Sequence, residues 1–200
     1  MVQKINNKKS FSLKFDLLTG LSPGAISKKR LLSDMKGMYY DKDAYEKIVV
    51  EKDAVVYEFY DLNINPNPEN LSFGTTILYP GKVGDEYYMT KGHFHDELNT
   101  AEIYYCLRGF GYLLMEDQQG RTEIQEFKPS ISVYVPPGFA HRSINTSNDE
   151  PLITFFVYRA DAGHDYKTIE EKGFRKLIIE KGGQPTIIDN PKWNIQKTRR

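Results

Sequence analysis

The sequence has little of several features that mark specialised classes of protein. Its 200 residues include a single cysteine, Cys106, so the chain can form no disulfide within itself. The 27 Lys and Arg residues balance the 27 Asp and Glu residues, and a formal charge of zero gives no reason to expect binding to nucleic acid or anionic lipid. We therefore expect a soluble, reduced, cytoplasmic protein.

Long hydrophobic runs are also lacking. None approaches the roughly 18 apolar residues that a membrane-spanning helix requires, and residues 1–15 lack the continuous apolar stretch of a signal peptide. The sequence has no heptads, internal repeats or low-complexity segments. Its length suits a single domain, by the usual size of about 100–200 residues.

What the chain does have favours β-structure. Tyrosine and phenylalanine, with 14 and 11 residues, dominate the aromatic content, and 15 glycines and 10 prolines are spread along the chain. This mixture is typical of short strands joined by tight turns, and strands recurring every 8–12 residues predict an all-β sandwich or closed barrel. The expected strands are residues 54–62, 71–81, 86–95, 100–107, 111–117, 121–127, 131–137, 141–147 and 151–159.

The two ends of the chain are less regular. Residues 27–53 hold the only plausible N-terminal helices, which Ser33 and Asp41 could cap. Residues 14–24 are typical of a strand or a short helix, and residues 168–183 of a helix or a last strand. We expect an N-terminal extension, 1–53, that packs on a barrel, 54–183, followed by a C-terminal tail, 184–200.

The histidines are the candidate functional residues. His93 and His95 stand two residues apart, and such positions on a strand share one face. If residues 96–100 form a hairpin loop, Glu102 returns beside them, and His141 follows a second turn that contains two prolines. Three imidazoles and one carboxylate could hold a divalent metal ion and leave two positions of an octahedral ion open.

Each of these residues has a simpler interpretation when taken alone. A single histidine in a strand is more often a core or surface residue than a ligand, and a single glutamate is usually solvated. The combination of a His-x-His pair, a glutamate one hairpin away and a third histidine after a proline turn favours metal binding.

The same segments resemble a known superfamily. GHFHDELNTAEIYYCLRGFG, residues 92–111, resembles the first cupin motif, and PPGFAHRSIN, residues 136–145, resembles the second. Phe139 and Ser143 stand where Trp and Thr are expected. The resemblance implies a cupin double-stranded β-helix, which is a jelly-roll barrel.

A narrower resemblance follows from the flanking residues. Thr75, Thr76, Tyr158 and the segment His164–Tyr166 make residues 70–170 similar to the cupin-type glucose-6-phosphate isomerases. This resemblance implies an aldose–ketose isomerase that interconverts glucose 6-phosphate and fructose 6-phosphate in glycolysis and gluconeogenesis. The metal ion that it implies is Fe²⁺ or Mn²⁺, with Ni²⁺ or Zn²⁺ possible.

Roles for individual residues also follow from the resemblance. The implied metal ligands are His93, His95, Glu102 and His141. The implied catalytic candidates are Glu102, Tyr158 and His164, with Glu102 as the base of an enediolate route, although a metal-assisted hydride shift would need no base. The implied substrate-binding residues are Thr76, Thr90 and Gly92 at the phosphate and Tyr104, Tyr158, His164 and Tyr166 around the sugar.

Two local expectations concern the segment before the histidine pair. Thr90 and Gly92 share strand parity with each other but not with His93, so the chain must bend or bulge at Gly92 if both roles hold. Lys91 could pair with a phosphate, although a lysine in such a loop is usually solvated.

Alternatives and partners stay open. The same ligand set would suit another cupin enzyme such as an iron dioxygenase, or a non-catalytic sugar-binding cupin, whereas a metal-free nucleotide-sugar epimerase would not need it. Ile103, Tyr105 and Leu107 face away from the expected site. Either the N-terminal segment or a second subunit must cover that face, and we expect a homodimer.

Overall fold

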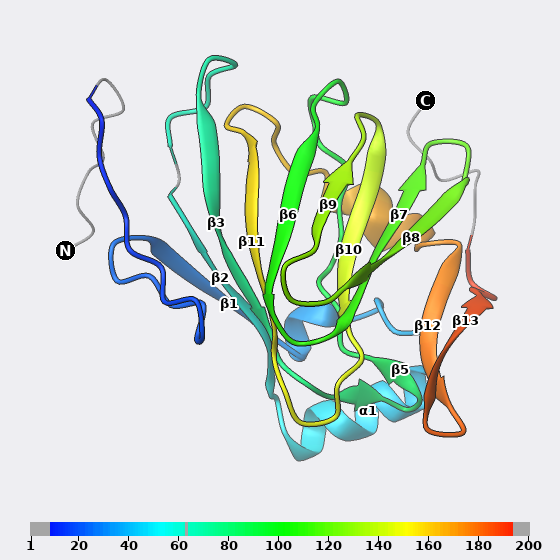
Figure 1. Ribbon diagram of the computed structural model, residues 1–200. Coiled ribbons are helices and arrows are strands. Elements are labelled where there is room, and N and C mark those ends of the chain that lie inside the picture. The colour runs from blue at the N-terminus through cyan, green and yellow to red at the C-terminus, as the bar shows by residue number, and fades with distance from the viewer. Residues whose placement is uncertain (1–8, 63, 194–200) are drawn as a thin grey trace.

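The computed structural model describes residues 9–62 and 64–193, and its strands form a cup (Figure 1). Two antiparallel sheets build the wall, and a third sheet of four strands lies beside them. The six-stranded sheet has the order β1 (Ile26–Leu31), β2 (Val55–Asp61), β3 (Leu71–Leu78), β11 (Leu152–Arg159), β6 (Glu102–Arg108) and β9 (Ser132–Val135). The three-stranded sheet has the order β10 (Phe139–Asn145), β7 (Gly111–Asp117) and β8 (Thr122–Phe127). The third sheet has the order β13 (Gln184–Asp189), β12 (Lys176–Lys181), β5 (Glu86–Tyr87) and β4 (Lys82–Val83).

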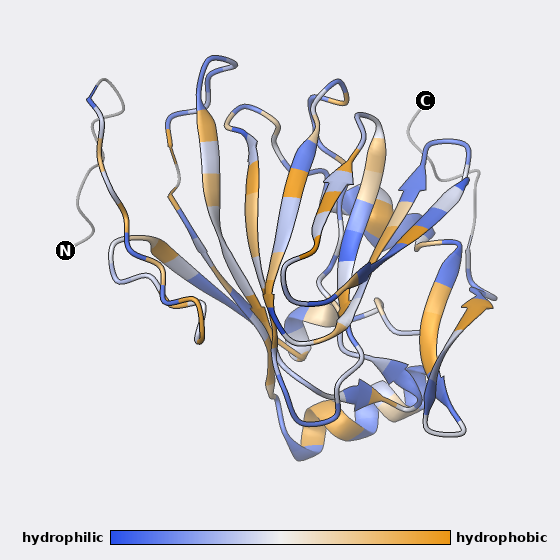
Figure 2. Cartoon of the chain, viewed as in Figure 1, coloured by the Kyte–Doolittle hydropathy of each residue, from blue (hydrophilic) through white to orange (hydrophobic). Residues whose placement is uncertain are grey.

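Successive side chains of each strand point alternately into the cup and away from it, and burial alternates accordingly. In β6, Glu102, Tyr104 and Cys106 are buried, whereas Ile103 and Tyr105 are exposed on the outer face. Figure 2 shows hydrophobic and hydrophilic residues alternating along strands of the wall. β8 lies beside β9, so the two sheets close around one hydrophobic core. The all-β barrel expected from the sequence is confirmed.

One expected strand is largely absent from the described chain. Residues 86–95 form only the two-residue strand β5, followed by isolated bridges at Met89, His93 and Phe94. Gly92 interrupts the extended backbone with a φ of +72°, a left-handed conformation that favours glycine. The expected bend at Gly92 is therefore present.

The N-terminal segment differs from its prediction. Residues 26–31 form strand β1 rather than a helix, because they pair with β2 along the edge of the large sheet. Asp41 does cap helix α1 (Lys42–Glu51), since its side chain accepts a hydrogen bond from Ala44 N. Ser33 caps no helix, because it begins the three-residue 3₁₀ turn η1 (Ser33–Met35) and bonds instead to Asp53.

The other uncertain segments are also settled. Residues 14–24 form neither a helix nor a strand and consist of turns and irregular backbone. Residues 168–183 contain both predicted alternatives in succession, the end of helix α2 (Tyr166–Lys172) and strand β12. The segment expected as a tail begins with strand β13, paired with β12, and its residues from 194 onward lie outside the described part. No helix within the described residues has the length and apolar character needed to cross a membrane.

Candidate metal centre and active site

Four side chains meet at one point inside the cup. The donor atoms of His93, His95, Glu102 and His141 all lie within 4.8 Å of one another. The two histidines of the pair come from the bent segment after β5, Glu102 is the first residue of β6, and His141 belongs to β10. The spacing in the sequence thus predicted which residues converge, even though His93 and His95 do not lie on a regular strand.

Gly92 allows the two histidine-bearing segments to approach. Backbone hydrogen bonds join His93 and His141 in both directions, at 3.3 and 3.1 Å. A Cβ atom at Gly92 would lie 2.9 Å from the Cβ atom of Arg142 and 3.0 Å from the carbonyl oxygen of His141. A larger residue would push the segments apart, because real Cβ contacts are longer than this.

The hydrogen bonds around His95 fix its tautomer. The Thr100 hydroxyl donates to the Glu97 carbonyl oxygen at 2.6 Å and lies 2.7 Å from His95 Nδ1. Since its one hydrogen is used, that hydroxyl must accept a hydrogen bond from Nδ1–H of His95. His95 Nε2 therefore presents a lone pair to the cluster, as the imidazole of a metal ligand does.

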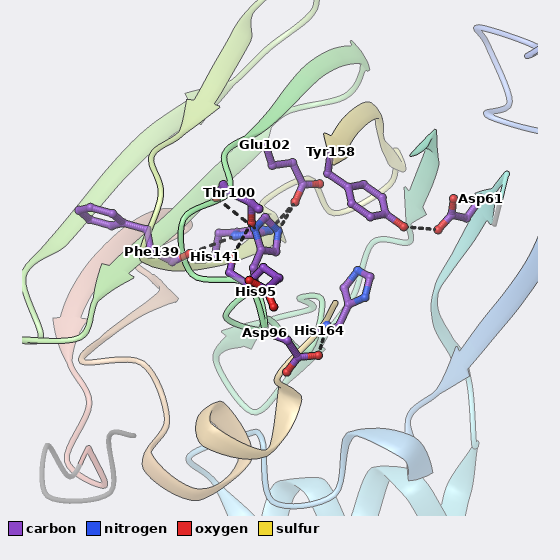
Figure 3. Close-up of polar contacts among 10 residues, drawn as sticks. Asp61, His95, Asp96, Thr100, Glu102, Phe139, His141, Tyr158 and His164 are labelled. Atoms are coloured by element: carbon purple, nitrogen blue, oxygen red, sulfur yellow. Dashed lines mark hydrogen bonds and ion pairs between the residues drawn. The ribbon is translucent and has the colours of Figure 1, made fainter. Parts of the chain in front are cut away.

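Lone pairs then face one another at the centre. Glu102 Oε2 lies 3.1 Å from His95 Nε2 and 3.0 Å from His141 Nε2 (Figure 3). His93 Nε2 is buried and has no hydrogen-bond partner among the described residues. Acceptor atoms at these separations repel unless a proton or a metal cation lies between them. The donor set of three imidazole nitrogens and one carboxylate oxygen fits a divalent first-row metal ion.

The charges of the cluster agree with that fit. Burial raises the pKa of Glu102, but protonated His141 and His95 rings, which donate to the carboxylate in the absence of a metal ion, more than offset this and hold it at about 2, so the carboxyl is ionised at neutral pH. Burial and the neighbouring histidines lower the pKa of His93 well below its usual range. A neutral imidazole and a carboxylate are the forms in which these side chains bind metals.

A cavity of about 370 Å³ opens in front of the cluster. All of the residues that the resemblance placed at the substrate line this cavity, namely Thr76, Thr90, Gly92, Tyr104, Tyr158, His164 and Tyr166. The structure therefore brings the predicted residues together, and their individual roles stay predictions.

Two of these residues have defined protonation states. The Tyr158 hydroxyl donates to Asp61 at 2.7 Å, and burial together with Asp61 raises its pKa far above neutral pH, so the phenol stays protonated. The ring of His164 lies 4.5 Å from that of His93 and stacks on Tyr166. Burial lowers the pKa of His164, which favours the neutral ring at pH 7.

Sequence reasoning missed the wall of the cavity that β1 and β2 contribute. These lining residues are Lys28, Arg30, Tyr57, Phe59 and Asp61. The alternation within residues 54–62 places the three β2 residues on one face, so that signal was present. The two β1 residues had no such signal, because the segment was expected to be helical. Lys91, considered as a phosphate partner, instead pairs with Glu170 at 2.7 Å.

Comparison with known proteins assigns the family. A protein-family model described as "Glucose-6-phosphate isomerase (GPI)" matches residues 28–194 of this chain. This chain belongs to the glucose-6-phosphate isomerase family. Among curated relatives, the glucose-6-phosphate isomerase of Thermococcus gammatolerans is 48% identical over 188 residues. The match covers 94% of this chain and 98% of the relative's length.

Two further relatives and one solved structure are also similar to this chain. The glucose-6-phosphate isomerase of Pyrococcus furiosus is 46% identical, covering 93% of this chain and 98% of its own. The putative glucose-6-phosphate isomerase 1 of Rhizobium meliloti is 38% identical, covering 90% of this chain and 86% of its own. The solved structure of an oxalate decarboxylase mutant from Bacillus subtilis is 18% identical with a TM-score of 0.43, covering 58% of this chain and 29% of its own. The resemblance to cupin-type glucose-6-phosphate isomerases, and the prediction of an enzyme of that family, are confirmed.

Proposed function

We propose that this chain interconverts glucose 6-phosphate and fructose 6-phosphate with the help of one divalent metal ion. The observation that carries the proposal is the cluster of His93, His95, Glu102 and His141 behind a cavity, in a member of this family. Among the predicted ions, we favour Fe²⁺ and Mn²⁺ because the site includes a hard carboxylate ligand, while Ni²⁺ and Zn²⁺ also bind imidazole nitrogen. We propose that the reaction serves glycolysis or gluconeogenesis in the cytoplasm.

The reaction moves hydrogen between two adjacent carbons of an opened sugar. When bound, the ion would polarise the neighbouring oxygens and offset the negative charge that develops on them. Tyr158 remains protonated and bonded to Asp61, so it orients a sugar oxygen rather than removing a proton. His164 is the neutral, adjacent group that can shuttle a proton between oxygens.

Glu102 is the candidate base of the enediolate route. Its ionised carboxylate is buried among the histidines and lines the cavity. If it removes the proton, Glu102→Gln should lower kcat by about 10²- to 10⁴-fold and abolish uptake of solvent deuterium into the product. Transfer without deuterium uptake in the unaltered enzyme would instead favour a hydride shift.

A coupled assay tests the function itself. Purified enzyme should convert fructose 6-phosphate before chelation, lose this activity when the ion is removed, and regain it when Fe²⁺ or Mn²⁺ is restored. Mannose 6-phosphate serves as the comparison substrate. The rate should be equal in air and without oxygen, because isomerisation consumes no oxygen. A dioxygenase would instead need oxygen for turnover. Unchanged turnover after complete removal of metal would overturn the proposal.

The outer face of the large sheet supports a homodimer. Phe15 packs at 6.1 and 5.6 Å on the rings of Phe73 and Phe155, so the N-terminal segment covers part of this face. Ile103 and Tyr134, opposite each other on β6 and β9, stay 48% and 57% exposed. A second copy of the chain is the proposed cover.

Substitution of that surface tests the dimer. We expect equilibrium sedimentation to give a dimer for the unaltered chain and a monomer for Ile103→Glu. Ile187→Glu is the matched control, because Ile187 is equally exposed, at 48%, but lies on β13. A monomer near 23 kDa for the unaltered chain at micromolar concentration would contradict the dimer.

A further inference from the structure

The cavity carries two positive charges that the histidine cluster does not use. Lys28 and Arg30 stand two residues apart on β1, so they share a face, and both line the cavity. Neither forms an ion pair within residues 9–62 and 64–193. Arg30 Nε is buried there without a hydrogen-bond partner. A buried guanidinium N–H without an acceptor is unfavourable, and an anionic ligand would remove that cost.

The strand register places these charges beside the expected phosphate site. Lys28 lies opposite Phe59, which lies opposite Thr76, so the three residues form a row across β1, β2 and β3. Arg30 lies opposite Tyr57 in the next row. Thr76 is one of the three residues that the resemblance places at the phosphate.

Tyr57 connects Arg30 to the other two phosphate residues. Arg30 lies opposite Tyr57 on the neighbouring strand, and its charge lowers the pKa of the Tyr57 phenol, which burial raises. Arg30, Thr90 and Gly92 line the same cavity as Tyr57, so the guanidinium and that turn of the chain face one space. The hydroxyl and backbone groups of the turn and the charge of Arg30 can therefore meet one anion.

Lys28 and Arg30 form the cationic end of the cavity. This cationic end and the metal cluster are separated along the same inner face of the sheet. Glu102 lies opposite Tyr158, which lies opposite Ser72, four residues from Thr76 on β3. Four residues of strand span about 13 Å, and side chains reaching in from both ends shorten that gap. An extended sugar with an anionic group at its far end fits this arrangement.

We propose that Arg30, assisted by Lys28, binds the phosphate of the substrate and selects phosphorylated over free sugars. The inference rests on the proposed isomerase function. A guanidinium matches a phosphate with two parallel charge-assisted hydrogen bonds. The phosphate is remote from the reacting carbons, so this contact is equal in the ground state and the transition state, and its loss raises KM while leaving kcat nearly unchanged.

Arg30→Gln tests the assignment. We expect KM for fructose 6-phosphate, and the inhibition constant of inorganic phosphate, to rise by about 10- to 100-fold, as for a lost charge-assisted hydrogen bond. Metal content and kcat should stay close to those of the unaltered enzyme. Arg30→Lys keeps the charge but loses the paired hydrogen bonds, so it should recover part of the loss.

Lys29→Gln is the matched control. Lys29 lies between the two proposed residues but points to the outer face, where it pairs with Glu58 and is 61% exposed. It should leave KM and phosphate inhibition unchanged. Should Arg30→Gln fail to fold, Arg30→Lys and Lys28→Gln decide the matter by the same two constants.

The outcomes separate the inference from the proposed function. An Arg30→Gln enzyme with unaltered KM and phosphate inhibition overturns the inference, and so does a parallel loss of kcat, metal and thermal stability, which would mean a structural role. If the unaltered enzyme shows no isomerase activity, the proposed function fails. Calorimetric titration with inorganic phosphate then still decides the inference: at least tenfold weaker binding by Arg30→Gln supports it, and equal binding refutes it.

Discussion

The two ends of the cavity are built in different ways. The histidine end comes from two short segments, residues 92–102 and 139–145, whose residue types and spacing are visible in the sequence. The cationic end comes from β1 and β2, and β1 reaches the cavity only because it pairs with β2 at the edge of the sheet. The comparison teaches that a ligand set can be encoded locally while the rest of the substrate site depends on tertiary pairing.

The largest effect should follow from removing a donor at the histidine end. His141→Ala leaves three donors, and we expect it to lose its metal and to lower kcat by about 10³-fold, the equivalent of several kcal/mol of charge stabilisation. Metal analysis and the coupled assay measure both. His164→Ala is the control, because His164 lies in the cavity outside the four-donor cluster. Loss of metal from the control and not from His141→Ala would contradict the ligand assignment.

A smaller effect should come from the group that orients His95. Thr100→Val removes the hydroxyl that accepts from Nδ1–H, and metal affinity should fall by about 10- to 100-fold, as for other outer-shell groups. Competition with a chelator measures that affinity. Thr100→Ser keeps the hydroxyl and should bind metal almost as well as the unaltered enzyme. Equal affinities for the valine and serine variants would show that the hydrogen bond is unimportant.

Gly92 joins the two ends, and its substitution should act on stability. Gly92→Ala would combine a φ of +72° with a Cβ atom 2.7 Å from the Phe174 ring, so we expect a loss of about 1–3 kcal/mol in the free energy of unfolding. Gly138→Ala is the control, since it has a φ of +81° and no described atom within 4 Å of its Cβ. Equal losses in thermal unfolding would contradict the close approach at Gly92.

The smallest effect belongs to Lys28 at the cationic end. Its side chain is exposed, so Lys28→Gln should raise KM for fructose 6-phosphate only by about two- to fivefold at low salt. The difference should disappear at about 1 M salt, where charges are screened within roughly 3 Å. A difference that persists at high salt would mean that Lys28 acts through something other than its charge.

Alternation and turn residues predicted the strands of the barrel except for residues 86–95, and the histidine motifs predicted the four-donor cluster. The same reasoning failed for β1, because its Lys28-Lys29-Arg30 stretch has no apolar alternation and forms a strand only by pairing with β2. The tail prediction overlooked an available signal. Gly182 and Gly183, both with positive φ, form the two-residue turn between β12 and β13.

Side-chain detail was beyond the reach of the sequence. The Thr100 hydroxyl that orients His95 lies five residues away in the chain, within a loop whose shape no pattern predicts. The contact between Tyr158 and Asp61 joins residues 97 apart in sequence, and the orphaned Nε of Arg30 appears only when the cavity is assembled. Such contacts depend on how the strands are ordered in the sheet.

Titration of the metal-free enzyme with Mn²⁺ tests the central claim most directly, with bound metal and isomerase activity measured on the same samples. If His93, His95, Glu102 and His141 hold the ion that the reaction needs, activity rises in proportion to bound metal and levels off at one ion per chain. Full activity in samples without bound metal, or bound metal that restores no activity, would contradict the account.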